Sequence, residues 1–146
     1  MKATVNPYQQ YQSNQVDTAD PKQLIVMLYD GAIRFLEIAA GGIEDFKNYD
    51  TVNENILKSQ DIITELMLSL NMDEGGEIAQ NLFNLYSFMK KELLDANIKK
   101  EKKPIQVVLT LLKELKEAWE KVEVAKPNLA AAREQSSDYK PFAAQG

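Results

Sequence analysis

The chain has 146 residues, the usual size of one domain, and contains neither cysteine nor histidine. The lack of these side chains excludes disulfides, thiol chemistry, typical zinc sites and imidazole acid–base catalysis. The 22 acidic and 17 basic residues give a net charge of −5, which argues against nucleic-acid binding. No stretch is apolar enough for a membrane span, and the N-terminus lacks the apolar centre of a signal peptide. These features predict a cytoplasmic protein without stable membrane insertion.

Residues 1–17 are rich in glutamine and asparagine and too polar to form a core helix. This composition is typical of a flexible arm. Three larger side chains, Tyr8, Tyr11 and Val16, interrupt the polar run. The alternative is therefore an arm whose larger side chains pack onto the folded domain.

The first helix is predicted from Pro21 to about Lys47. Asp20 can accept hydrogen bonds from the first free backbone amides, and proline suits the first helical position. The Gly41–Gly42 pair lowers helix stability by about 1 kcal/mol per glycine relative to alanine. The alternative is a helix that kinks or ends at these glycines.

This helix carries more apolar residues than one buried face requires. At about 100° per residue, one stripe forms the expected core face: Leu24, Met27, Leu28, Gly31, Phe35, Ile38, Ala39, Gly42 and Phe46. A second stripe lies on the far side: Val26, Tyr29, Ile33, Leu36 and Ala40. A helix this apolar must be covered nearly all round, either by the rest of the chain or by a partner.

A second amphipathic helix is predicted at about Thr51–Leu70, with Asp50 as its cap, followed by a turn at residues 71–76. Opposite its core face lies a row that contains Leu57 and Leu68. These leucines are either ordinary surface residues or part of a groove.

A third helix is predicted at about Glu77–Lys99, and Phe83 and Phe88 flank its core face, which is expected to include Ile78. The lysines at 99–103 suit the negative end of a helix dipole. A fourth helix follows at about Pro104–Val124. Its apolar residues include Val107 and Leu111.

Four helices with short connections predict an all-α fold, an antiparallel four-helix bundle over residues 18–126. The Ala-, Ser- and Pro-containing residues 127–146 are predicted to form a disordered tail.

The bundle cannot hold a histidine-containing di-iron site, and the sequence has no phosphate-binding glycine loop. Paired carboxylates such as Glu44–Asp45 are typical of solvated surfaces. We therefore expect no catalytic residue, no cofactor and no metal ligand.

A series of motifs in order along the chain resembles the family of flagellar secretion chaperones called FliS. These motifs are NPY at residues 6–8 with Tyr11, VDTADP at 16–21, LIVMLYDGAI at 24–33, SQDIITEL at 59–66, GGEIAQNL at 75–82, and the spacing of Leu112, Leu115 and Trp119. Together they cover about residues 6–124. The tail from Pro127 onward lies outside the resemblance.

The resemblance implies a cytoplasmic chaperone that binds the C-terminal segment of flagellin and prevents its premature polymerisation. It also implies delivery of flagellin to the flagellar type III export apparatus, with the export gate and flagellar regulators as further partners. In this family the N-terminal arm covers part of the bundle until the client displaces it. Tyr8 and Tyr11 stand where that arm would be.

The helices carry more apolar residues than their core faces require, and these extra residues predict a groove for such a client. The client would fold into helices as it docks. The helical wheels assign eight residues to this groove: Ile33, Leu36, Leu57, Leu68, Phe83, Phe88, Val107 and Leu111. For each of them the alternative is a place in the bundle core. Tyr8, Tyr11 and Val16 are expected to compete with the client. The alternative function is a non-catalytic helical adaptor that dimerises through the same faces.

Overall fold

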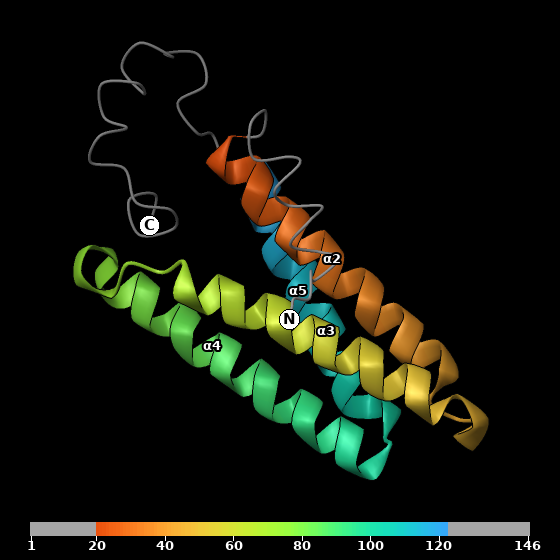
Figure 1. Cartoon of the computed structure of the whole chain (residues 1–146). Coiled ribbons are helices and arrows are strands. Elements are labelled where there is room, and N and C mark those ends of the chain that lie inside the picture. Colours follow the sequence, from red (N-terminus) through yellow and green to blue (C-terminus); the bar gives the residue numbers. More distant parts are fainter. Residues whose placement is uncertain (1–19, 123–146) are drawn as a thin grey trace, which may run out of the picture.

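The computed structural model describes residues 20–122, which form four long helices and one short 3-10 helix (Figure 1). In chain order these are α2 (Pro21–Gly42), η1 (Phe46–Asn48), α3 (Tyr49–Leu68), α4 (Met72–Lys99) and α5 (Lys102–Lys121). No strand occurs between residues 20 and 122. The predicted all-α four-helix bundle is confirmed. The arm at 1–17 and the tail at 127–146 lie outside the described residues.

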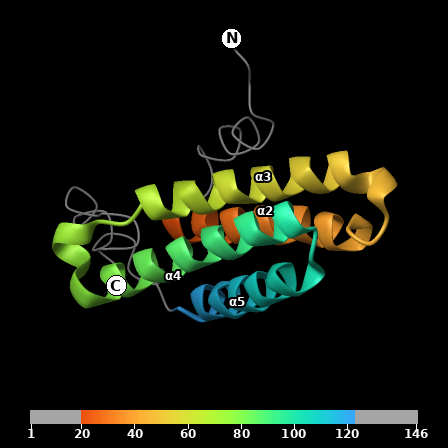
Figure 2. The same ribbon diagram turned by 90° about the horizontal axis from the view of Figure 1, so that it is seen from below.

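The four helices alternate in direction. Figure 2 shows α2 and α4 running one way and α3 and α5 running the other. α2 packs on α3 and α5, and α4 packs on the same two helices, so each helix has two neighbours. The core between them is almost wholly aliphatic, with two buried tyrosines, Tyr29 and Tyr86.

The first helix begins as predicted but ends earlier. The Asp20 carboxylate accepts a hydrogen bond from the backbone amide of Gln23 at 2.7 Å, and Pro21 opens the helix. The predicted end near Lys47 is wrong, because α2 stops at Gly42. A Cβ atom at Gly42 would lie 3.2 Å from the Cβ of Asn48. The glycine therefore lets the chain fold back closely through η1 into α3.

The face that α2 buries differs from the expected one. Ile25, Leu28, Tyr29, Ala32, Ile33, Leu36 and Ala39 are buried, whereas Ile38 and Phe46 are exposed. The buried face thus takes in much of the second stripe. Because α2 lies between α3 and α5, the surface that faces both of them becomes the core.

The connection between α3 and α4 is partly helical. Asn71 caps α4, and its side-chain oxygen accepts from the amides of Asp73 and Glu74 at 3.1 and 3.0 Å. A kink follows at Gly76, whose φ of 57° and ψ of −135° are not helical. After the kink Ala79 is buried, and Ile78, which was expected in the core, is exposed.

Replacing Gly76 by alanine should destabilise the protein by about 1–3 kcal/mol, because a side chain strains this backbone conformation. Gly41→Ala is the matched control, since a Cβ there meets no atom within 4 Å. It should stabilise α2 slightly, by at most about 1 kcal/mol. Urea unfolding of the two variants would measure the difference, and equal stabilities would contradict the role of the kink.

Candidate functional site

The seam between α2 and α5 is closed by ion pairs. Lys116 of α5 lies 2.6 Å from Asp30 of α2, and Lys113 lies 3.1 Å from Glu37. The hydrogen bond to Asp30 raises the pKa of Lys116 above its usual value. Among residues 20–122, these are the only ion pairs that join two helices.

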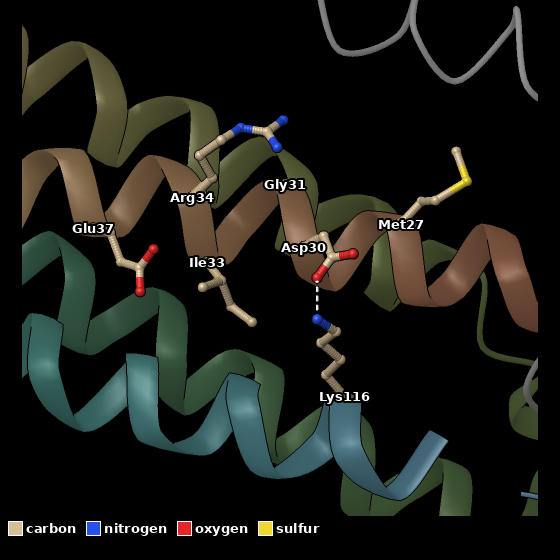
Figure 3. A pocket seen from close by; sticks show the side chains of 7 residues that line it. All are labelled: Met27, Asp30, Gly31, Ile33, Arg34, Glu37 and Lys116. Atoms are coloured by element: carbon tan, nitrogen blue, oxygen red, sulfur yellow. Dashed lines mark ion pairs between the residues drawn. The ribbon is translucent and has the colours of Figure 1, made fainter. Parts of the chain in front are cut away.

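The hollow at this seam is small and mostly polar. It is about 370 Å³ in volume and is lined by Met27, Asp30, Gly31, Ile33, Arg34, Glu37 and Lys116. In Figure 3 the Lys116 ammonium reaches Asp30 from α5, Glu37 points toward α5, and Arg34 points away from it. Its charged lining does not suit an apolar ligand.

Two predicted groove residues lie in this part of the bundle and are not exposed. Ile33 is 9% exposed and Leu36 is 0% exposed, and both belong to the core. Their assignment to an open groove is wrong for the folded bundle. They lie on the side of α2 that α5 covers, where the apolar surface is used for packing between helices.

Four exposed apolar side chains, two on α3 and two on α4, form a surface that we call the α3/α4 face. They are Leu57 (47% exposed) and Leu68 (74%) on α3, and Phe83 (37%) and Leu94 (54%) on α4. Three of these were assigned to the groove from sequence. Leu94 was missed, although it follows Phe83 by eleven residues and therefore lies on the same side of the helix.

Hydrogen bonds between α3 and α4 set the relative position of the four side chains. Asn97 Nδ2 donates to Asn53 Oδ1 at 2.6 Å. In the middle of the pair, Lys90 Nζ donates to Thr64 Oγ1 at 2.7 Å. This antiparallel register brings Leu57 level with Leu94, and Leu68 level with Phe83. The face thus has two apolar ends and a polar middle.

On the next pair of packed helices, we group Phe88 of α4 with Val107 and Leu111 of α5 as the α4/α5 face. Phe88 and Val107 are exposed, and Leu111 is partly buried against the core. All three were among the predicted groove residues. Together with the α3/α4 face, they leave apolar side chains accessible on both sides of α4.

A polar cluster lies in the core beneath α4. The hydroxyls of Tyr29 and Tyr86 are 2.6 Å apart and fully buried. Burial raises the pKa of Tyr29 to about 12, while hydrogen bonds with Tyr86 and Trp119 oppose part of the rise. Burial and the neighbouring Tyr29 raise the pKa of Tyr86 still further. The cluster links α2, α4 and α5.

Within the described part of the chain, no group of three or more metal-ligating side chains is arranged to hold a metal ion. No helix between residues 20 and 122 has the length and apolar content to cross a bilayer.

Comparison with known proteins identifies the family. The model of the family described as "Flagellar protein FliS" matches residues 4–126. The chain belongs to the FliS family. This match confirms the resemblance seen in the sequence motifs, and it includes the whole described bundle. FliS is a family of chaperones, which is not an enzyme class.

Several FliS proteins are similar to this chain over most of their length. The FliS of Bacillus subtilis is 37% identical over 117 residues, covering 80% of this chain and 86% of the relative. The FliS of Salmonella typhimurium is 38% identical over 108 residues, covering 73% and 79%. The FliS of Vibrio cholerae is 32% identical over 133 residues, covering 90% and 97%. All three are named flagellar secretion chaperones.

Proposed function

We propose that this protein is a cytoplasmic chaperone that binds the C-terminal segment of flagellin. In this role it prevents premature polymerisation of flagellin and delivers the monomer to the flagellar type III export apparatus. The observation that carries the proposal is membership of the FliS family, whose similar members are named flagellar secretion chaperones. Contacts with the export gate and with flagellar regulators belong to the same proposal.

The two apolar faces supply the surface that such a client needs. A disordered segment that folds on binding loses conformational entropy, so it requires an extended apolar surface to offset this loss. α4 lies between the α3/α4 face and the α4/α5 face, which together hold Leu57, Leu68, Phe83, Leu94, Phe88, Val107 and Leu111. The α2/α5 seam is unsuited to the same task because it is closed by ion pairs.

The N-terminal arm at residues 1–17 is proposed to cover part of this surface in the absence of client. Tyr8, Tyr11 and Val16 are the side chains that would compete with flagellin. Coverage of an apolar face lowers the tendency to self-associate. An arm of this kind would also reduce the apparent affinity for the client, because the client must displace it.

Titration calorimetry tests the proposal with a peptide of the C-terminal flagellin segment from the same organism. The intact chain should bind the peptide in a saturable, one-to-one manner. A chain lacking residues 1–17 should bind it more tightly. Equal affinities would leave the chaperone role in place and contradict the competing arm.

Absence of binding by both chains would contradict the flagellin assignment. The exposed apolar faces would then favour the second candidate, an adaptor bundle that dimerises through them. Light scattering over a range of concentrations would separate the two functions, because the adaptor should form a concentration-dependent dimer. A chaperone that remains monomeric and binds the peptide would contradict the adaptor.

A further inference from the structure

We infer that the α3/α4 face selects a client helix by its pattern of apolar and acidic residues. The preferred helix has apolar side chains eleven residues apart and a carboxylate between them that faces Lys90. This inference rests on the proposed function, since it specifies which part of a disordered client binds there. It follows from the arrangement of the four apolar residues around the Thr64–Lys90 hydrogen bond.

The apolar ends of the face are equally spaced on both helices. Leu57 and Leu68 are eleven residues apart on α3, and Phe83 and Leu94 are eleven residues apart on α4. Eleven residues correspond to three helical turns, or about 16.5 Å. A client helix lying along the face would meet both ends with residues of the same spacing. Its side chains four and seven positions after the first apolar contact would then face the polar middle.

Lys90 has hydrogen-bonding capacity left for a client. Its ammonium carries three donors, and the described residues offer it the neutral hydroxyl of Thr64 at 2.7 Å. None of the ion pairs formed among residues 20–122 includes Lys90. Its backbone carbonyl accepts from Gln60 Nε2 at 3.1 Å, which ties this point of α4 to α3.

A bound helix would remove water from this partly buried ammonium. An apolar side chain above Lys90 would leave the charge without a new partner, which is unfavourable. A carboxylate would form a charge-assisted hydrogen bond there. Asp61 lies on the same row of α3 but forms no ion pair with Lys90 in the described structure, so the ammonium is not already neutralised.

A charge reversal on the chaperone tests this selectivity. Lys90→Glu should weaken binding of the C-terminal flagellin peptide by at least about tenfold, the usual effect of losing a hydrogen bond to a charged group. Lys91→Glu is the matched control, because it makes the same charge change at the next residue, which is exposed and points about 100° away from Lys90 around the helix. It should change the affinity by less than about twofold. Circular dichroism would verify that both variants are folded.

A pair of designed helical peptides tests the pattern without flagellin. Both carry leucines eleven residues apart, and the residue four positions after the first leucine is glutamate in one and lysine in the other. The wild-type protein should prefer the glutamate peptide, and Lys90→Glu should prefer the lysine peptide. Fluorescence anisotropy of labelled peptides would measure both preferences.

The outcomes separate this inference from the proposed function. If flagellin binds but Lys90→Glu behaves like Lys91→Glu, the selectivity is overturned and the chaperone role stands. If flagellin does not bind, but Lys90→Glu reverses the preference between the two designed peptides, the face has the inferred selectivity and the flagellin assignment fails. If neither flagellin binding nor the reversal is observed, both are overturned.

Discussion

Replacing Leu57 and Leu68 together by aspartate is expected to weaken binding of the flagellin segment by at least about 100-fold. Each leucine is accessible on α3 and contributes to one end of the α3/α4 face. Losing the burial of one such side chain costs about 1.5–3 kcal/mol, and about 1.4 kcal/mol corresponds to a factor of ten in affinity. Calorimetry against the same peptide would measure the loss.

The fold should survive this double substitution, because both side chains already contact water. The matched control is Thr51→Asp with Gln106→Asp, which adds the same charge at two exposed positions of α3 and α5 outside both apolar faces. It should leave the affinity within about twofold of the wild type. An unfolded Leu57→Asp, Leu68→Asp protein would show that the leucines support the core, and unchanged binding would exclude the α3/α4 face as the client site.

Raising the pH above 10 is expected to destabilise the bundle through its buried tyrosines. The pKa of Tyr29 rises from 10.0 to about 12 on folding, so the folded state holds the hydroxyl proton more tightly than the unfolded state. The associated stability is fully present below pH 10 and is lost as the pH rises through 12. By linkage, this rise of the Tyr29 pKa contributes roughly 3 kcal/mol to the free energy of unfolding. The raised pKa of Tyr86 adds a loss in the same direction.

Urea unfolding between pH 8 and 12 would measure this loss. The variant with Tyr29→Phe and Tyr86→Phe lacks both titrating groups and should show a flatter pH dependence above pH 10. Tyr49→Phe is the control, because it removes a tyrosine hydroxyl from a partly buried side chain outside the Tyr29–Tyr86 cluster. Parallel pH profiles of stability for the wild type and the double variant would show that deprotonation of the two tyrosines does not cause the loss.

The sequence alone was sufficient for the number of helices and for most of their bounds. Asp20 and Pro21 act through neighbouring backbone atoms, so the start of α2 is a local property of the chain. The amphipathic periodicity that predicts a helix is likewise local. The accessible leucines of α3 were also predicted, because they lie opposite a strongly apolar face of their own helix.

The tertiary structure decided which of the two apolar stripes of α2 faces inward. A helical wheel ranks the faces of one helix, but the positions of α3 and α5 determine which face is covered. Leu36 therefore became part of the core although the wheel placed it in a groove. The end of α2 at Gly42 was decided in the same way, by the close approach of Asn48 as the chain turns back.

The polar middle of the α3/α4 face also depends on tertiary structure. Thr64 and Lys90 are far apart in the sequence, and only the register of α3 against α4 joins them and aligns the apolar pairs on either side. The sequence by itself thus determined the helices, their apolar surplus and the family. The packing of the helices determined which of those apolar residues remain accessible, because burial depends on neighbours that are distant along the chain.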